Sequence, residues 1–433
     1  MIEITPEYKE VFDAIERRDP FIFVSGRAGT GKTTLVTHLR DTLDGNVVVV
    51  APTGVAALQV RGVTIHSFFK FPPRLIFPEE DIKKLKDRRL YSKIRLLIID
   101  EVSMVRADIV DAIDLFLRVN GPKEGIPFGG VQVLFVGDLF QLPPVVRSEE
   151  LEVLRSRSYE APYFFHAMAL HRQELTCIEL KKIYRQKDAS FTALLNDIRV
   201  DRDVPKALEI LNAACYSETA EQDEHAITLT TNNAKADNIN LRQSQAIQTE
   251  PVILTGQVSG RFNIDERNLP APLNLTLKVG SRVMLTANDQ TYPKRWVNGS
   301  LGVVRTITSD YVKVELDHPL SKVYVEVPKG QWETYQYEFD DLTQQIKPVV
   351  IGTYSQYPLM LAWAVTIHKS QGKTLERVKV DLSGGAFAPG QVYVALSRCT
   401  SLEGITLEKP IRRSDVKCDP NVKNFYKRLQ IDF

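Results

Sequence analysis

Short apolar runs alternate with helical patterns along the first half of the chain. The runs at 21–24, 46–51, 95–99 and 131–136 are rich in β-branched residues and lack polar alternation. A strand that is apolar on both faces is typical of a parallel sheet covered by helices. The segment that follows the first run has a helical pattern through Leu39. The first half therefore predicts an α/β domain built on a parallel sheet.

The second half repeats this texture and then departs from it. Apolar runs there predict the strands of a second sheet domain, at 176–180, 226–230, 349–354, 362–365 and 377–382. From about Phe262 to Gln345 the pattern changes to short alternating strands with turns, such as 281–286, 296–300, 301–306 and 311–316. Asn298-Gly299 is a strong hairpin signal. These features predict a small antiparallel barrel inserted into the second sheet domain.

Composition sets the broad class of the protein. A chain of 433 residues with 43% hydrophobic residues is expected to form two or three domains. The net charge of +1 gives no overall sign of a polyanionic partner, so any nucleic-acid surface must come from local clustering. The four cysteines have neither disulfide-framework nor zinc-site spacing, which favours a reducing compartment. With no leader and no membrane-length apolar run, we expect a cytoplasmic or organelle-matrix protein.

The octapeptide from Gly26 to Thr33, GRAGTGKT, predicts a phosphate-binding loop because it follows an apolar strand and opens a helix. Its small residues allow consecutive backbone N–H groups to curl around a polyphosphate at the positive end of the helix dipole. Lys32 is expected to reach the terminal phosphates and Thr33 to bind Mg²⁺. The chain is therefore predicted to bind a nucleoside triphosphate.

Polar side chains follow two further strands. Asp100 and Glu101 come directly after 96–99, where Asp100 would bind the nucleotide's Mg²⁺ and Glu101 would act as general base. Helix capping is the alternative for such a pair. Gln141 follows the run at 131–136 and is a candidate γ-phosphate sensor, with a surface turn closed by Pro143 and Pro144 as the alternative.

Two arginines of the second half have the charge that a nucleotide clamp requires. Arg185 lies in the segment IYRQ and Arg398 in the segment QVYVALSR. An arginine from a neighbouring domain neutralises transition-state charge on the γ-phosphate. A surface salt bridge is the alternative for each of them.

Seven ordered motifs carry a resemblance to a known family. They are GRAGTGKTT, APTGVAALQVRGVTIHSF, LLIIDEVSM, GDLFQLPPV, LKKIYRQ, TIHKSQGKTLERV and VYVALSRCTSLEGI, between about Ile4 and Glu408. In this order they resemble a superfamily-one DNA helicase of the petite-integration-frequency (PIF-type) family, to which the RecD and Dda helicases are related. Pro127-Phe128-Gly129-Gly130 is similar to that family's own signature segment.

The resemblance implies an α/β fold of two RecA-like parallel-sheet domains, the first with a small wedge insertion and the second with an SH3-like β-barrel insertion. The first domain would span 1–66 and 95–171, with the wedge at 67–94. The second would span 172–261 and 346–433, with the barrel at 262–345.

By the same resemblance, single residues acquire expected roles. Those that match the family's nucleotide site are Gly26, Ala28, Gly29, Thr30, Gly31, Lys32, Thr33, Thr34, Asp100, Glu101, Gln141, Arg185, Gly372 and Arg398. Those on segments that contact single-stranded DNA are Thr53, Gly54, His66, Thr366, His368, Lys369, Ser370 and Gln371. Small hydroxyls, amides and a basic residue suit a phosphate backbone without sequence preference. Buried structural histidines are the alternative for His66 and His368.

The wedge segment adds aromatic residues and cations. Phe68 and Phe69 are predicted to be exposed and to contact DNA, because aromatics interleaved with basic residues suit base stacking. A basic run follows, with Lys83, Lys84, Lys86, Arg88 and Arg89. A helix with a solvated basic face is its alternative. At the chain start, Tyr8 stands where the family usually has an adenine-reading glutamine, so Tyr8 is expected to stack on a base instead.

The resemblance implies an ATP-dependent and Mg²⁺-dependent motor that moves 5′ to 3′ on single-stranded DNA as a monomer. It would unwind duplexes, single-strand/double-strand junctions and G-quadruplex DNA in replication, repair, recombination or telomere maintenance. The expected location is the cytoplasm of a bacterial or phage system, associated with the nucleoid and not with a membrane. A P-loop kinase or GTPase, a non-hydrolysing DNA clamp and an RNA helicase are the alternatives, of which the last is the closest.

Overall fold

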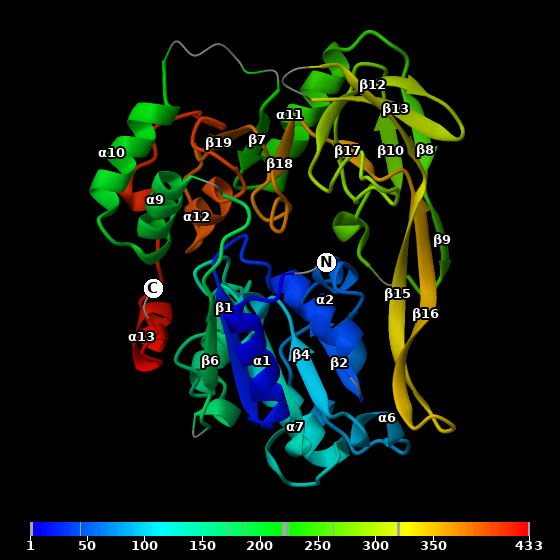
Figure 1. Cartoon of the computed structure of the whole chain (residues 1–433), viewed down its shortest axis with the longest axis vertical. Coiled ribbons are helices and arrows are strands. Elements are labelled where there is room, and N and C mark those ends of the chain that lie inside the picture. The colour runs from blue at the N-terminus through cyan, green and yellow to red at the C-terminus, as the bar shows by residue number, and fades with distance from the viewer. Residues whose placement is uncertain are drawn as a thin grey trace. The chain divides into compact units, whose positions relative to one another are not determined.

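The computed structural model describes residues 3–43, 45–171, 173–186, 188–218, 223, 225–262, 264–317 and 321–431. The chain forms two compact units (Figure 1). The first comprises Met1–Tyr184, Glu333–Ile351 and Asp419–Phe433, and the second comprises Arg185–Trp332 and Gly352–Cys418. Each unit contains a parallel sheet with helices, so the predicted α/β class is confirmed.

The sheet of the first unit has six strands, all paired in parallel, in the order β3-β2-β4-β5-β1-β6. The strands are β1 (Phe21–Gly26), β2 (Val47–Ala51), β3 (Val63–Thr64), β4 (Leu96–Ile99), β5 (Gln132–Gly137) and β6 (Thr176–Leu180). The assignment of 176–180 to a second sheet was wrong, because β6 pairs with β1 at the edge of the first sheet.

Alternate residues of β1 enter two different cores. Ile22 and Val24 pack in an aliphatic layer with residues of the helices α1 (Pro6–Glu16) and α2 (Lys32–Thr42). Phe23 points into an aromatic layer, where its ring centroid lies 5.5 Å from that of Phe164 and 5.9 Å from that of Phe425. Burial on both faces explains why these strands are apolar throughout.

The helices of the first unit begin with α1 (Pro6–Glu16) and α2 (Lys32–Thr42) and include one from the end of the chain. The others are α3 (Gly54–Gln59), α4 (Ile65–Phe69), α5 (Pro78–Asp81), α6 (Arg89–Ser92), α7 (Ala107–Asn120), α8 (Ser148–Ser156) and α13 (Pro420–Arg428). In α13, the Tyr426 hydroxyl lies 2.6 Å from the Ser25 hydroxyl at the end of β1. The last helix of the chain therefore supports the first sheet.

The two phenylalanines predicted to be exposed are buried. Phe68 and Phe69 are 6% and 1% exposed. Their rings pack in an aromatic cluster with those of Phe71, Tyr91 and Phe116. This corrects the expectation that both present their faces to DNA, since a ring enclosed by other rings has no face free for a base.

The basic run after these aromatics is not helical over 83–88, so the alternative of a basic helix was also wrong. Several of its charges are paired with carboxylates. Lys84 lies 2.9 Å from Glu124, and Arg89 makes ion pairs with Asp87 and Asp341. These carboxylates reduce the positive field that a DNA surface would need at this place.

In the second unit, a four-stranded parallel sheet has the order β18-β7-β19-β20. Its strands are β7 (Ile227–Thr230), β18 (Ala364–Thr366), β19 (Val378–Asp381) and β20 (Ile405–Leu407), and its helices are α9 (Ala189–Val200), α10 (Val204–Cys215), α11 (Asn233–Ala246) and α12 (Gln391–Leu396). The runs at 226–230, 362–365 and 377–382 fall on this sheet as predicted.

Antiparallel strands cover part of the predicted insertion at 262–345 and continue beyond both of its ends, since the strands Val252–Thr255 and Leu359–Leu361 lie outside it. Five of them form the order β14-β13-β12-β11-β17, and β8 pairs with β10. Their bounds are β8 (Val252–Thr255), β10 (Asn274–Leu277), β11 (Arg282–Leu285), β12 (Leu301–Ile307), β13 (Tyr311–Leu316), β14 (Val323–Pro328) and β17 (Leu359–Leu361). The strands expected at 281–286, 301–306 and 311–316 are confirmed. The turn expected at Asn298-Gly299 is confirmed, and it lies at the end of a long loop between β11 and β12, which pair antiparallel.

A further, three-stranded sheet has the order β15-β16-β9, from β9 (Gln257–Gly260), β15 (Gly330–Asp340) and β16 (Gln345–Gln356), and it contains the run at 349–354 (Figure 1). That run pairs antiparallel with β9, so its assignment to the second parallel sheet was wrong. Residues 333–351 of this ribbon belong to the first unit, where the Tyr337 hydroxyl accepts a hydrogen bond from the Val49 amide at 3.0 Å.

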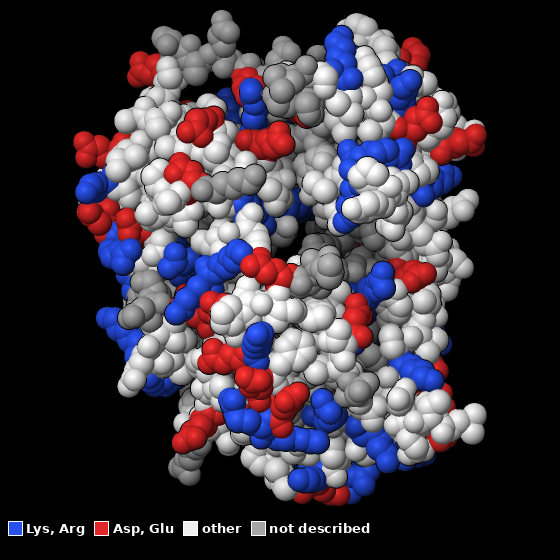
Figure 2. Space-filling model, in the orientation of Figure 1, with Lys and Arg blue, Asp and Glu red and all other residues white. Residues whose placement is uncertain are grey.

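Positive and negative side chains are interspersed on the face shown in Figure 2, in line with the nearly balanced charge of the chain. Within the described ranges, no helix has both the length and the apolar character needed to cross a membrane.

Replacing Phe69 with Ala is expected to destabilise the first unit by about 3–5 kcal/mol, because it empties a buried aromatic site. Urea denaturation followed by fluorescence measures the change. Phe387→Ala is the matched control, since Phe387 is 63% exposed. If Phe69→Ala unfolds at the same urea concentration as the wild type, the assignment of Phe69 to the core fails.

Candidate nucleotide and nucleic-acid sites

The loop after β1 has the backbone conformation that the sequence predicted for phosphate binding. Gly29 and Gly31 have φ angles of +81° and +86°, which strongly favour glycine. A Cβ on Gly26 would lie 2.5 Å from the Thr30 hydroxyl oxygen. The chain therefore turns sharply through small residues and enters α2 at Lys32, as a phosphate cradle requires.

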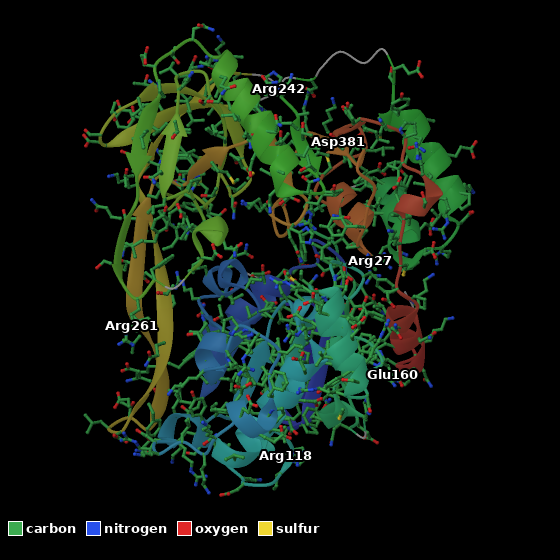
Figure 3. The ribbon with its side chains drawn as sticks, turned by 180° about the vertical axis from the view of Figure 1, so that it is seen from behind. Arg27, Arg118, Glu160, Arg242, Arg261 and Asp381 are labelled. Atoms are coloured by element: carbon green, nitrogen blue, oxygen red, sulfur yellow. The ribbon has the colours of Figure 1, made fainter. Side chains whose placement is uncertain are left out.

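The Lys32 ammonium lies against this loop. It donates hydrogen bonds to the carbonyl oxygens of Gly26 and Arg27 at 2.7 and 3.0 Å, and Arg27 is labelled in Figure 3. The Thr30 hydroxyl donates to the same Arg27 carbonyl at 2.9 Å. These contacts keep the positive charge of Lys32 beside the positions where phosphate oxygens would bind. Ala28, Thr33 and Thr34 complete the predicted set in this loop and the first turn of α2.

Asp100 and Glu101 follow β4 at the same carboxyl edge of the sheet. Asp100 is 3% exposed and accepts a hydrogen bond from the Glu101 amide at 2.9 Å. The pKa of Asp100 is raised above its usual value, mainly by burial and then by the neighbouring Glu101 charge. The Glu101 amide and the Lys32 charge act in the opposite direction but do not outweigh them. Glu101 has a φ of +49°, a strained backbone conformation for a residue with a side chain. Such strain is common at functional sites.

The carboxylate of Asp100 fits a bound cation. Its charged form is disfavoured by burial, and a divalent cation would stabilise that form. Oxygen donors are the ligands that Mg²⁺ prefers, and Thr33 has a hydroxyl in the first turn of α2. The residues present are therefore compatible with the Mg²⁺ site predicted from the sequence.

Gln141 lies beyond β5 and is 6% exposed, so the alternative of a surface turn is wrong. Its side-chain amide donates to Asp138 Oδ2 at 3.2 Å. The preceding residue, Phe140, stacks on Tyr426 of α13 with ring centroids 5.0 Å apart. Helix α13 thus contacts both the strand before the phosphate loop and the segment that carries Gln141.

Tyr8 supports the phosphate loop through a hydrogen bond to its backbone. Its ring is 3% exposed, and its hydroxyl donates to the Gly31 carbonyl at 2.9 Å. Burial raises the pKa of Tyr8 to about 12, so the hydroxyl keeps its proton at neutral pH. The expectation that Tyr8 stacks on a base was wrong, because the ring is enclosed.

Sequence reasoning missed Tyr184, although it lies in the segment that contains Arg185. Tyr184 is 45% exposed, and its amide donates to the Gly29 carbonyl at 2.9 Å. A ring carbon of Tyr184 lies 3.8 Å from the position of a Cβ on Gly31. An exposed aromatic ring beside a phosphate loop is a candidate surface for the nucleotide base.

The second unit brings Arg185 and Arg398 into one polar cluster. Arg185 donates to the Thr374 hydroxyl and to the Ser397 carbonyl, both at 3.1 Å. Arg398 is 1% exposed and donates to the Val394 carbonyl at 3.0 Å and to the Ser397 hydroxyl at 3.1 Å. Arg398 is buried, so the alternative of a surface salt bridge is wrong for it. Desolvation lowers the pKa of Arg185, whose side chain is half-buried.

The expected DNA-contact segment between β18 and Thr374 contains exposed and buried residues. Lys369 is exposed, and His368 and Gln371 are half-buried. Ser370 is fully buried and donates to the Ile367 carbonyl at 2.7 Å, so its expected DNA contact is wrong. Thr366 is 4% exposed and its hydroxyl oxygen accepts from the Lys369 amide, which makes it a support for this turn. Gly372 follows with a φ of +80°.

The first unit holds the other expected DNA residues near the ends of β2 and β3. Thr53 is the N-cap of α3 and accepts from the Ala56 amide at 3.2 Å, and Gly54 begins that helix. His66 lies in α4 and is half-buried. Burial, and then the charge of Arg106, lower the pKa of His66, so this histidine is neutral at physiological pH.

Phe387 is a further residue that sequence reasoning missed. It is 63% exposed, and its ring stacks on His368 with centroids 6.4 Å apart and an interplanar angle of 13°. Its signal was a single aromatic residue between Gly385 and Gly390 in a glycine-rich loop. The exposed Phe387 ring, stacked on His368 next to Lys369 in the sequence, suits an unpaired base.

Replacing Tyr8 with Phe keeps the buried ring and removes the hydrogen bond to Gly31. A hydrogen bond of about 1 kcal/mol that orders the loop corresponds to about a five-fold weaker affinity for a nucleotide. Titration with a fluorescent nucleotide analogue measures this change. Tyr292→Phe is the control, since Tyr292 is 98% exposed. Unchanged affinity of Tyr8→Phe would show that the hydroxyl does not order the loop.

Comparison with known proteins identifies the family. Residues 3–205 match the model of the PIF1-like helicase family. The chain is 32% identical to the ATP-dependent DNA helicase Pif1 of Bdellovibrio bacteriovorus over 99% of its own length and 93% of that protein. It is also 32% identical to the ATP-dependent DNA helicase PIF1 of Emericella nidulans, over 97% of its length, but spans only 62% of that protein.

Solved structures agree with this result. Bacteroides sp. Pif1 in complex with ADP-AlF4 is 36% identical, with a TM-score of 0.90 over 99% of this chain and 98% of that one. Bacteroides Pif1 bound to single-stranded DNA is 36% identical, with a TM-score of 0.69 over the same shares of the two chains. The chain belongs to the PIF1-like helicase family.

Proposed function

We propose that this chain is an ATP-dependent DNA helicase that uses ATP hydrolysis to move along single-stranded DNA and unwind duplexes. The observation that carries the proposal is that the loop with Lys32 and the pair Asp100-Glu101 follow β1 and β4 at the carboxyl edge of one parallel sheet. A phosphate loop alone binds a nucleotide, whereas a loop with adjacent carboxylates is equipped to hydrolyse it. The names of the related helicases support the same activity.

In hydrolysis, a water oxygen attacks the γ-phosphorus, and Glu101 accepts a proton from that water. The bond between that phosphorus and the β,γ-bridging oxygen breaks, and ADP and phosphate form. The Lys32 ammonium and the amides of the loop stabilise negative charge on the phosphate oxygens. Gln141 would orient the water or contact the γ-phosphate, and its bond to Asp138 and the neighbouring Phe140–Tyr426 stack support this role.

Thr33 and Asp100 would hold Mg²⁺, which supplies charge neutralisation for the phosphate oxygens when it is bound. Arg185 and Arg398 of the second unit neutralise charge that develops on the γ-phosphate.

On the DNA side, Lys369, His368, Gln371 and Phe387 are the residues of the second unit that we propose to contact single strands. Thr53, Gly54 and His66 would serve in the first unit. Contacts to phosphates and to base faces carry no sequence preference, which suits a motor that must pass over any sequence. Thr366 and Ser370 act indirectly, by shaping the turn that carries Lys369.

We further propose 5′-to-3′ movement, action of a monomer at single-strand/double-strand junctions, and unwinding of G-quadruplex DNA. The segment 67–94 would act as a wedge and 262–345 as an SH3-like barrel, with the remaining segments as two RecA-like motor domains. The proposed setting is the nucleoid of a bacterial or phage system, in repair, recombination or genome maintenance.

Glu101→Gln is expected to bind ATP normally and to hydrolyse it ~100- to 10,000-fold more slowly, because the general base is lost. Lys32→Ala is expected to lose both tight binding and turnover. Phosphate release, measured with and without single-stranded DNA, separates the two variants when nucleotide affinity is measured in parallel. Glu152→Gln, an exposed residue of α8, is the control. Wild-type turnover in either site variant would contradict the site assignment.

Strand separation on matched duplexes tests the helicase proposal. The substrates carry a 5′ DNA tail, a 3′ DNA tail or a 5′ RNA tail, and ATP hydrolysis is followed in parallel. The proposal predicts unwinding of the duplex with the 5′ DNA tail alone. Equal unwinding with the RNA tail would support an RNA helicase, and hydrolysis without any separation would leave a DNA-dependent ATPase.

A further inference from the structure

The long loop between β11 and β12 has a fixed shape because it folds around one carboxylate. Asp289 is 5% exposed and accepts hydrogen bonds from the Thr291 hydroxyl at 2.7 Å and from the Arg295 Nε at 2.7 Å. The Thr291 and Arg295 amides donate to it as well. These bonds hold the pKa of Asp289 far below its usual value, and the side-chain hydrogen bonds from Arg295 have the largest effect. The loop is therefore a rigid extension of the antiparallel domain.

The end of this loop, Asn298-Gly299, lies against the segment Lys373-Thr374. Asn298 Oδ1 accepts a hydrogen bond from the Lys373 ammonium at 3.0 Å. A Cβ on Gly299 would lie 2.6 Å from the Thr374 carbonyl oxygen, so the two backbones touch at a distance that a side chain would prevent. The φ of Gly299 is +100°, which also favours glycine.

The segment that this turn contacts is itself bonded to Arg185 and Arg398. The Thr374 hydroxyl accepts from Arg185 Nε at 3.1 Å. One residue later, the Leu375 amide donates to the Arg398 carbonyl at 3.0 Å. Arg185 is thus bonded to the residue whose carbonyl Gly299 contacts, as well as to the Ser397 carbonyl. A displacement of Thr374 by a few tenths of an ångström would move the donor directions of Arg185 by a similar amount.

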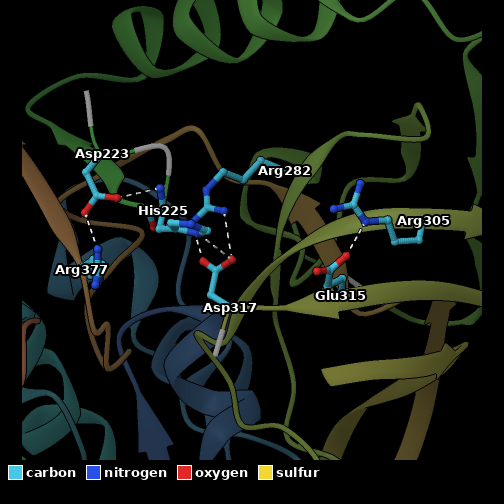
Figure 4. Close-up of polar contacts among 7 residues, drawn as sticks. All are labelled: Asp223, His225, Arg282, Arg305, Glu315, Asp317 and Arg377. Atoms are coloured by element: carbon cyan, nitrogen blue, oxygen red, sulfur yellow. Dashed lines mark hydrogen bonds and ion pairs between the residues drawn. The ribbon is translucent and has the colours of Figure 1, made fainter. Parts of the chain in front are cut away.

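A second anchor joins the antiparallel domain to the parallel sheet of the same unit. Arg282 of β11 makes an ion pair with Asp317 at 2.6 Å and a hydrogen bond to the His225 carbonyl, just before β7 (Figure 4). The His225 ring lies 3.4 Å from Asp317. This anchor ties β11, after which the loop begins, to the segment just before β7.

We propose that the Asn298-Gly299 turn is a positioning element for ATP hydrolysis, which sets the Arg185 guanidinium through Thr374. This inference rests on the proposed function, because it requires that Arg185 act on the γ-phosphate. It gives the inserted antiparallel domain a role in the hydrolysis step itself, besides any contact that the domain makes with DNA. Asn298 and Gly299 are positioning residues, since neither touches the nucleotide in this scheme.

The test is steady-state ATP hydrolysis by Gly299→Ala at saturating single-stranded DNA. We expect kcat to fall about ten-fold or more, since misplacement of a transition-state group acts on kcat, while KM for ATP stays within about two-fold. Gly280→Ala is the matched control. Gly280 has the same strained φ of +99°, but a Cβ there would meet only Ile247, at 3.7 Å. An equal loss of kcat in Gly280→Ala would overturn the proposal.

Asn298→Ala gives a second arm that does not strain the backbone. It removes the hydrogen bond to Lys373, and we expect a loss of kcat of about five-fold, as one hydrogen bond allows. Thermal unfolding of both variants, compared with the wild type, shows whether the fold is intact. Wild-type kcat in a folded Asn298→Ala and a folded Gly299→Ala would overturn the proposal.

A double-mutant cycle separates failure of this inference from failure of the proposed function. In an Arg185→Lys background, the Gly299→Ala change should alter kcat by less than about two-fold, because both changes act on the same group. A full additional loss would show that Gly299 acts by another route and would overturn the inference. If Arg185→Lys alone keeps wild-type kcat, the role of Arg185 in the proposed function fails first.

Discussion

The Lys32 ammonium lies within hydrogen-bonding distance of the Gly26 and Arg27 carbonyls, and much of the first unit is arranged around this contact. The contact requires a tight loop, which requires left-handed glycines at Gly29 and Gly31. It also places a positive charge at the carboxyl edge of the sheet, near the buried carboxylate of Asp100. A triphosphate with its cation would satisfy all of these groups at once.

Support for that edge comes from distant parts of the chain. Tyr8 of the first helix and Tyr426 of the last each place a hydroxyl on the segment around the phosphate loop. Tyr426 also stacks on Phe140, one residue before Gln141. The segments proposed to bind and sense phosphate therefore contact buried aromatic side chains, which limits the movement of these segments. In the second unit, hydrogen bonds to backbone carbonyls and hydroxyls hold the side chains of Arg185 and Arg398 in place.

The sequence was sufficient for features that depend on local pattern. The strands β1, β2, β4 and β5 were placed correctly, because their apolar runs are buried on both faces. The glycine loop and the acidic pair after β4 were also placed correctly, because these polar segments directly follow such strands. Periodicity cannot say which sheet a strand joins, so β6 and the run at 349–354 were assigned wrongly.

Burial of single residues depended on partners far along the chain. The ring of Tyr337 packs at 5.8 Å from that of Phe68, a contact that no local pattern announces. Ser370 and Thr366 looked like DNA contacts because they lie in a motif, yet their hydroxyls serve the turn itself. Conversely, Phe387 and Tyr184 are exposed aromatics whose position beside a site becomes visible only in three dimensions.

The central claim is that hydrolysis draws on both units of the chain. Single-turnover ATP hydrolysis by Arg398→Ala, with nucleotide affinity measured alongside, tests it most directly. The account predicts a rate lower by about 10³-fold or more with affinity within a few-fold of wild type, as for arginines that act on the transition state. A wild-type rate in this variant would show that the first unit hydrolyses ATP without the arginine cluster, and would contradict the account.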